Sequence, residues 1–364
     1  MPNWWNGGTR KPMNETPDAQ TSSNITKSVS DVLSIIDQER EREIISRRFG
    51  LFDHKETLEQ IGELLGITRE RVRQLEKAIL IRLKIAAEGG KIPSLSEVEK
   101  ELVLRLSECG RVSRVSDLAD RIDTEGKSKY LKAHIGFLAE LSPKLTALNE
   151  NDRFYHSVGI SDYGDEKDLK SKVSAIVTVI KKHGEPITES ELHSKIDGYE
   201  HPDQVKAMAS LSKDLASLKN LWGLVKWPLV NPKNIRDKIY VILADNSKPM
   251  HFSDIAKAIK TSDFKRKNVT TQAIHNELIK DKRFVLIGRG IYALNEWGYK
   301  RGTVADIIAQ ILDDSNEPLH RDEIVRRVLK KRQVKETTIL LNLQSKPQFK
   351  RVAKATYVFD KEKS

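Results

Sequence analysis

Four side chains near residue 70 have the types and the spacing needed to read the edges of DNA bases. Arg69, Glu70, Arg73 and Gln74 fall within two turns of one expected helix. Arginine grips guanine, glutamine pairs with adenine and glutamate accepts a hydrogen bond from cytosine N4, so this set suits the major groove. The competing interpretation is a solvated helix face on which arginine and glutamate pair with each other. We expect all four residues to contact bases.

The helix that carries these residues is predicted to begin after Thr68 and to run to about Ile85. Its apolar positions recur at spacings of three and four residues and share one face: Val72, Leu75, Ile79 and Leu83. The preceding segment reads as a shorter helix, because Thr57 and Gln60 have the spacing of a capping box and Gly66 suits a helix end. A short helix, a glycine turn and a longer basic helix are typical of a helix-turn-helix.

The N-terminal segment has a different composition. Residues 1–28 are rich in Asn, Thr, Ser, Gly and Pro without an apolar period, which predicts a disordered tail. From about Asp31 the apolar residues recur at helical spacing. We therefore expect the helix-turn-helix domain to occupy residues 29–88.

The remainder of the chain contains a repeat. A longer apolar-periodic helix, a polar turn, a helix with apolar residues four apart, a third helix and an aromatic-rich segment recur four times. Three helices and a hairpin make a winged helix, and Gly288-Arg289-Gly290 suits the tip of one such wing. The predicted fold is mainly α, a helix-turn-helix followed by a tandem array of winged-helix domains with short β-hairpin wings. The predicted domains are 91–158, 167–228, 231–297 and 302–360.

A family resemblance joins the two segments of the helix-turn-helix. Glu39-Arg-Glu-Arg-Glu-Ile-Ile-Ser-Arg-Arg-Phe-Gly-Leu51 and the run Thr57 to Glu76 resemble region 4 of primary bacterial sigma factors. The resemblance implies a domain that reads the promoter −35 element and sits on the β flap of RNA polymerase. By position it implies base contacts from Arg69, Glu70, Arg73 and Gln74, and we expect phosphate contacts from Thr57, Arg71 and Lys77. Nothing resembles sigma region 2, so we do not expect a complete sigma factor.

A second resemblance covers the third repeat. Lys248-Pro-Met-His-Phe252, Asp281-Lys-Arg-Phe-Val285 and Trp297 are similar to the N-terminal domain of the RNA polymerase delta subunit, a HARE-type winged helix. The fourth repeat shares this pattern more weakly. Residues 91–158 and 167–228 share only the architecture.

The charge of the chain is concentrated in the last two repeats. The formal net charge is +11, and residues 257–364 hold 24 basic and 13 acidic residues, which accounts for the whole surplus. Basic residues there would neutralise phosphates without reading sequence, although HARE-type domains that bind polymerase or another protein are the alternative. The candidate phosphate contacts are Lys265, Arg266, Lys267, Arg289, Lys330, Lys331 and Arg332.

Other classes of protein find little support. One cysteine, Cys109, and nine histidines without metal-ligand spacing predict neither a disulfide nor a metal site. His251 and His320 hold equivalent points of the repeat and are expected to pack or cap its turn. No apolar run approaches the roughly 20 residues of a membrane span, and no catalytic motif appears. We expect a cytoplasmic, nucleoid-associated protein without enzymatic activity, cofactor or small-molecule substrate.

Two functions remain open. The leading hypothesis is a bacterial transcription factor that reads double-stranded DNA in the major groove and associates with RNA polymerase. The alternative is a polymerase-associated interaction protein, a flap binder or sigma competitor that reads little sequence. A nucleoid or mobile-element protein without polymerase contact would also fit the basic array.

Overall fold

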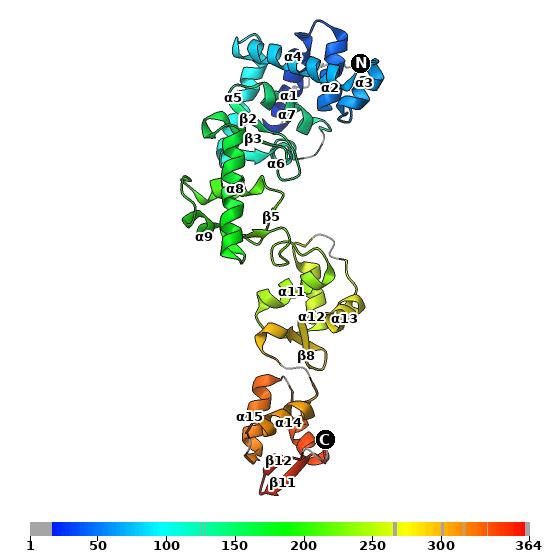
Figure 1. Ribbon diagram of the computed structural model, residues 1–364, viewed down its shortest axis with the longest axis vertical. Helices are drawn as coiled ribbons and strands as arrows, with labels where there is room; N and C mark the ends of the chain where they lie inside the picture. The colour runs from blue at the N-terminus through cyan, green and yellow to red at the C-terminus, as the bar shows by residue number, and fades with distance from the viewer. Residues whose placement is uncertain are drawn as a thin grey trace, which may run out of the picture. The chain divides into compact units, whose positions relative to one another are not determined.

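The part of the chain that the structure describes is mainly helical, with four small three-stranded antiparallel sheets (Figure 1). The computed structural model describes residues 17–124, 126, 128–264, 268–299, 302–315, 317–332 and 334–360. These residues divide into two compact units, one ending at Val225 and the other beginning at Lys226. The predicted fold class is confirmed. Among the described residues, no helix combines the length and the apolar character that a bilayer crossing requires.

The helix-turn-helix lies where the capping signals predict it. The C-cap Gly50 has φ 68°, a left-handed value that favours glycine. Thr57 and Gln60 form the predicted capping box, in which the Thr57 side chain accepts from the Gln60 N–H and the Gln60 side chain accepts from the Thr57 N–H. The three helices are α2 (Glu39–Phe49), α3 (Leu58–Leu65) and α4 (Arg69–Glu88).

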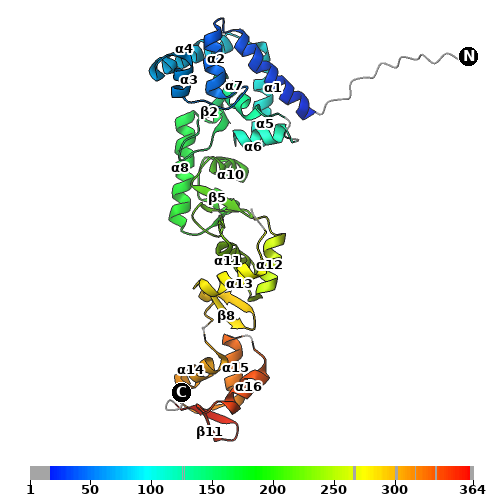
Figure 2. The ribbon, with the colours of Figure 1, turned by 90° about the vertical axis from the view of Figure 1, so that its right-hand side faces the viewer.

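A further helix, α1 (Pro17–Ser34), occupies much of the segment predicted as a tail. The prediction of a disordered tail up to residue 28 is therefore wrong from Pro17 onward, and residues 1–16 lie outside the described residues. Ile25, Val29 and Val32 lie on one helical face and are fully buried. They pack α1 against α5 (Pro93–Glu108) and α7 (Leu131–Leu141), whose ribbons lie near α1 in Figure 2. Tertiary packing thus stabilises a helix of low intrinsic propensity.

The same order of elements then recurs four times: helix, short strand, helix, helix and hairpin. In every sheet the last strand lies between the short strand and the first hairpin strand. This short strand, only two or three residues long, was not predicted, because a two-residue strand has no sequence period. The N-terminal unit contains the first two repeats: α5, β1 (Val112–Arg114), α6 (Val115–Ile122), α7, β2 (Leu145–Leu148) and β3 (Ser157–Ile160), then α8 (Glu166–His183), β4 (Ile187–Thr188), α9 (Glu189–Ser194), α10 (Pro202–Ser210), β5 (Leu215–Leu218) and β6 (Leu221–Leu224).

The second unit contains the third and fourth repeats. Here the short strand ends on the histidine that caps the next helix: His251 accepts from the Ser253 N–H and His320 from the Asp322 N–H, both at 3.3 Å. The predicted capping role of both residues is confirmed. The elements are α11 (Ile235–Asn246), β7 (Met250–His251), α12 (Phe252–Thr261), α13 (Thr271–Lys280), β8 (Phe284–Gly288) and β9 (Ile291–Leu294), then α14 (Val304–Ser315), β10 (Leu319–His320), α15 (Arg321–Lys331), α16 (Glu336–Ser345), β11 (Phe349–Ala353) and β12 (Thr356–Phe359).

The wing of the third repeat turns at the predicted glycine. Gly290 has φ 70°, and a Cβ atom there would lie 2.5 Å from Nε2 of His251. The register of β8 and β9 shifts between Leu286 and Gly288, as in a hairpin with a bulge at its tip. The prediction that this glycine pair forms a wing turn is confirmed.

The helix-turn-helix and the first winged helix share one hydrophobic core. Its buried residues extend from Ile25 to Val158. Phe49, at the end of α2, contacts Phe137 of α7 with ring centroids 4.9 Å apart. The buried His134 of α7 has Nε2 at 2.8 Å from the carbonyl oxygen of Leu51, so Nε2 donates to that carbonyl. These contacts make the two predicted domains parts of one packed structure.

The buried His134 makes the stability of the N-terminal unit depend on pH. Burial lowers the pKa of His134, so below the unfolded value of roughly 6.5 the unfolded chain binds more protons than the folded one. Stability is therefore fully present above that pH and is lost as the pH falls, by at most about 1.4 kcal/mol per pH unit for one group. We expect a lower urea midpoint at pH 5.5 than at pH 7.5.

The variant His134→Gln is expected to flatten this pH dependence. Burial also lowers the pKa of His156, so part of the dependence will remain. An equal pH dependence in wild type and His134→Gln would contradict the assignment.

Candidate nucleic-acid interface

The start of α4 is fixed by a close approach of the backbone. A Cβ atom at Gly62 of α3 would lie 2.7 Å from the carbonyl oxygen of Ile67, so only glycine lets the turn fold onto α3. Gly66 caps α3 with φ 64°. Thr68 then caps α4 by accepting from the N–H of Arg71 at 3.2 Å. Together these contacts set the direction in which α4 leaves the turn.

One face of α4 is buried as predicted. Val72, Ile79 and Leu83 are at most 2% exposed, and Leu75 is partly buried. Val72 packs with Ile44 of α2 and Ile61 of α3. An ion pair of 3.1 Å between Arg48 and Glu76 adds a link between α2 and α4. The opposite face of α4 is thereby held towards solvent.

The exposed face brings together the residues predicted to read bases. Arg73 donates twice to the Glu70 carboxylate, from Nε at 2.8 Å and from Nη2 at 2.6 Å, and Gln74 Nε2 lies 3.4 Å from Glu70 Oε1. The hydrogen bond from Arg73 lowers the pKa of Glu70, and the same bond raises the pKa of Arg73. Both residues are ionised at neutral pH, and Arg73 can reach a guanine only by exchanging this carboxylate for the base.

The other candidate side chains on the helix-turn-helix differ in whether they already have hydrogen-bond or ion-pair partners. Arg69 and Lys77 are exposed and make no side-chain hydrogen bond or ion pair within the described structure. Arg71 lies 3.4 Å from Gln74 Oε1. Thr57 is exposed, although its hydroxyl already serves the capping box of α3. Arg69 and Lys77 are thus the cations most available to a phosphate or a base.

The described candidates in the second unit differ in their exposure and in their partners. Arg289 is exposed at the wing turn and Lys330 is exposed at the end of α15, whereas Lys331 is half-buried. Arg332 donates to the carbonyl oxygen of Gly302, and burial lowers the pKa of its guanidinium. Arg332 therefore holds the fold at this point. The remaining candidates, Lys265, Arg266 and Lys267, lie outside the described residues.

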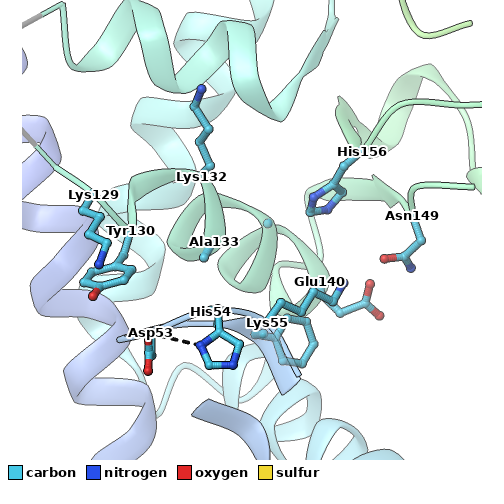
Figure 3. Close-up of a pocket in the computed structure, with 13 residues that line it drawn as sticks. Asp53, His54, Lys55, Lys129, Tyr130, Lys132, Ala133, Glu140, Asn149 and His156 are labelled. Atoms are coloured by element: carbon cyan, nitrogen blue, oxygen red, sulfur yellow. Dashed lines mark ion pairs between the residues drawn. The ribbon is translucent and has the colours of Figure 1, made fainter. Parts of the chain in front are cut away.

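A pocket that sequence reasoning missed lies beside the helix-turn-helix. It has a volume of about 400 Å³ and lies between the loop that follows α2 and the first winged helix (Figure 3). Lys55, Asn149 and His156 bring polar side chains to it. These residues are up to about 100 positions apart, so no local pattern could have joined them. Within the described residues, no group of three His, Cys, Asp or Glu side chains is placed to hold a metal.

Comparisons with known proteins agree with the geometry of α2 to α4. The family model for sigma-70 region 4 matches residues 38–84. A stretch of 73 residues is 40% identical to RNA polymerase sigma factor SigA of Nostoc sp. (strain PCC 7120 / SAG 25.82 / UTEX 2576), covering 19% of this chain and 18% of that protein. A stretch of 55 residues is 49% identical to RNA polymerase sigma factor RpoD of Helicobacter pylori (strain ATCC 700392 / 26695), covering 14% and 8%.

The match is confined to one part of each protein. The chain spans less than a fifth of the length of these curated relatives. The resemblance of residues 231–297 to the delta subunit stays a prediction. The likeness to sigma-70 region 4 therefore belongs to residues 38–84 of the chain.

Proposed function

We propose that the chain is a DNA-binding bacterial transcription factor that reads duplex DNA in the major groove through α4 and associates with RNA polymerase. The observation that carries the proposal is the exposed start of α4 in a sigma-70 region 4 domain, where Arg69, Glu70, Arg73 and Gln74 stand together. Arg and Gln pair with guanine and adenine edges in the major groove. The similar proteins are RNA polymerase sigma factors, which favours polymerase as a partner, with the β flap as the expected contact.

The winged-helix array adds contacts that do not read sequence. Arg289 and Lys330 are exposed cations in the basic half of the chain and suit DNA phosphates. Thr57, Arg71 and Lys77 would position α4 on the DNA backbone. Such a protein would act in the cytoplasm, associated with the nucleoid, without an enzymatic activity.

A specific observation favours a second function. Arg73 is already held by both oxygens of Glu70, so the free protein does not present an unpaired guanidinium at this position. A polymerase-associated interaction protein that binds the flap and reads little DNA sequence would have this feature. This alternative would be supported by two results together. DNA affinity would fall steeply with salt but not differ between sequences, and the chain would bind the isolated flap.

The variant Arg73→Ala tests base reading. DNA fragments selected by the wild-type chain provide the cognate site, and a scrambled duplex provides the reference. Loss of one bidentate base contact is expected to weaken binding to the selected site by roughly 5- to 150-fold. Binding to the scrambled duplex should change little. Electrophoretic shift at fixed salt measures both affinities.

Lys77→Ala is the matched control on the same helix. Loss of a phosphate contact should weaken both duplexes alike and reduce the salt slope by about one. Equal affinity of wild type and Arg73→Ala for every duplex would exclude base reading at this position.

A further inference from the structure

The pocket of about 400 Å³ beside the helix-turn-helix has an unusual charge arrangement. One wall is the end of α2 with the loop that follows it, and the other is α7 with the residues between β2 and β3. In Figure 3, Lys55, Asn149 and His156 lie on one side of the pocket, while Lys129 and Tyr130 lie on the other. Polar groups from three separate segments therefore converge on one space within the N-terminal unit.

The carboxylates near this space already have partners. Glu140 on α7 forms an ion pair of 2.7 Å with Lys84, and Glu150 forms one of 2.7 Å with Lys213. Asp53 lies 3.3 Å from His54 Nδ1. Glu76, farther along α4, pairs with Arg48 at 3.1 Å. None of these carboxylates is left to neutralise a further cation.

Lys55 and His156, on the same side of the pocket, have no counter-ion within the described structure. Neither side chain makes a hydrogen bond or an ion pair within the described structure, and the amide of Asn149 is also free there. The Lys55 side chain is exposed, but partial desolvation by the atoms beside it lowers the pKa of its amine, with Arg48 adding to the effect and Glu76 and Glu150 opposing it. Burial lowers the pKa of His156, with Lys55 adding to the effect and Glu150 and Glu140 opposing it. An anion between them would favour the charged form of both groups.

The backbone supports the position of the imidazole. Gly136 on α7 leaves room for the His156 ring, since a Cβ atom there would lie 2.3 Å from His156 Cε1. A helix with any larger residue at this point would push the ring out of its place. The imidazole is therefore held in the pocket by packing, before any ligand arrives.

We propose that this pocket binds a small phosphate-bearing molecule, with its phosphate between Lys55, Asn149 and His156. A phosphate monoester carries a charge of about −1.5 to −2 near neutral pH, which matches one ammonium and one imidazolium better than a single carboxylate does. The volume falls within the roughly 300–1,000 Å³ of ligand sites and exceeds that needed by inorganic phosphate. At the other side Lys129 Nζ lies 5.0 Å from the centroid of the Tyr130 ring, so a planar group would stack on the opposite face of that ring. Such a ligand ties the loop before α3 to the first winged helix.

Calorimetric titration of the full chain with adenosine monophosphate, inorganic phosphate and adenosine tests the proposal. Both phosphates should bind, the nucleotide more tightly, and adenosine should not. Lys55→Met is expected to weaken nucleotide binding by about tenfold or more, the value of one charge-assisted hydrogen bond. Affinity should rise as the pH falls from 8 towards 6.5, because the bound anion raises the pKa of His156 and draws a proton onto its imidazole, and His156→Asn should remove that rise.

Lys132→Met is the matched control, because Lys132 lines the same pocket but its amine pairs with Asp120 at 3.0 Å. This variant should bind the nucleotide like wild type. Equal losses in Lys132→Met and Lys55→Met, equal binding of adenosine, or no binding of either phosphate would each overturn the proposal. So would loss of duplex DNA binding in Lys55→Met without nucleotide binding in wild type, which would assign Lys55 to DNA. Arg73→Ala should leave nucleotide binding unchanged, so this test fails or succeeds independently of base reading.

Discussion

Ile25→Asp is expected to unfold most of the N-terminal unit. Ile25 is fully buried in the core that α1 shares with α5 and α7. Truncation of a buried isoleucine alone costs about 2–5 kcal/mol. An unpaired carboxylate in the same place adds a penalty of several kcal/mol. A total of this size is comparable with the roughly 5–15 kcal/mol that keeps an ordinary domain folded.

Urea unfolding followed by circular dichroism measures this effect. The control is Lys27→Asp, which places the same charge two residues away on the exposed face of α1. This control should change stability by less than about 0.5 kcal/mol, as surface substitutions usually do. A small effect of Ile25→Asp, similar to that of the control, would mean that α1 is dispensable for the core.

Phe137→Ala is expected to destabilise the helix-turn-helix and the first winged helix together. Phe137 is fully buried on α7 and contacts Phe49 of α2. Loss of a buried phenylalanine costs about 3–5 kcal/mol through lost burial and the cavity left behind. Because the contact joins the two parts, a probe in α4 and a probe in α5 should report the same lowered urea midpoint.

Leu104→Ala on α5 provides the comparison, because Leu104 is 56% exposed. It should shift the midpoint little at either probe. Two separate transitions, with only the winged-helix probe affected by Phe137→Ala, would show that the two parts fold independently.

The features that the sequence could predict are those that short-range chemistry determines. The capping box of Thr57 and Gln60, the left-handed Gly66 and the apolar face of α4 are all encoded within one or two turns of helix. The histidine caps of α12 and α15 belong to the same class, since each cap bonds the N–H two residues later. The mainly helical repeat followed from the apolar period for the same reason.

The features that the sequence could not predict depend on contacts between distant residues. The apolar residues of α1 lie among Ser, Thr and Asn, which favour the helix only weakly. The helix is stabilised by packing against α5 and α7. The grouping of Arg69, Glu70, Arg73 and Gln74 was predictable from spacing, and so was the pairing of Arg73 with Glu70, which the competing interpretation of a solvated helix face anticipated. The pocket escaped prediction because Lys55 and His156 belong to different segments.

The shared core also constrains the order in which the chain can fold during synthesis. The small cluster of Ile44, Ile61 and Val72 needs only residues up to α4, so the helix-turn-helix can form early. The core that contains Ile25 and Val29 cannot close until the ribosome has released α7, because α1 packs on α5 and α7. Until then Ile25 and Val29 stay exposed to water and to other chains. A nascent chain halted before α7 would therefore present an apolar helix to chaperones and proteases.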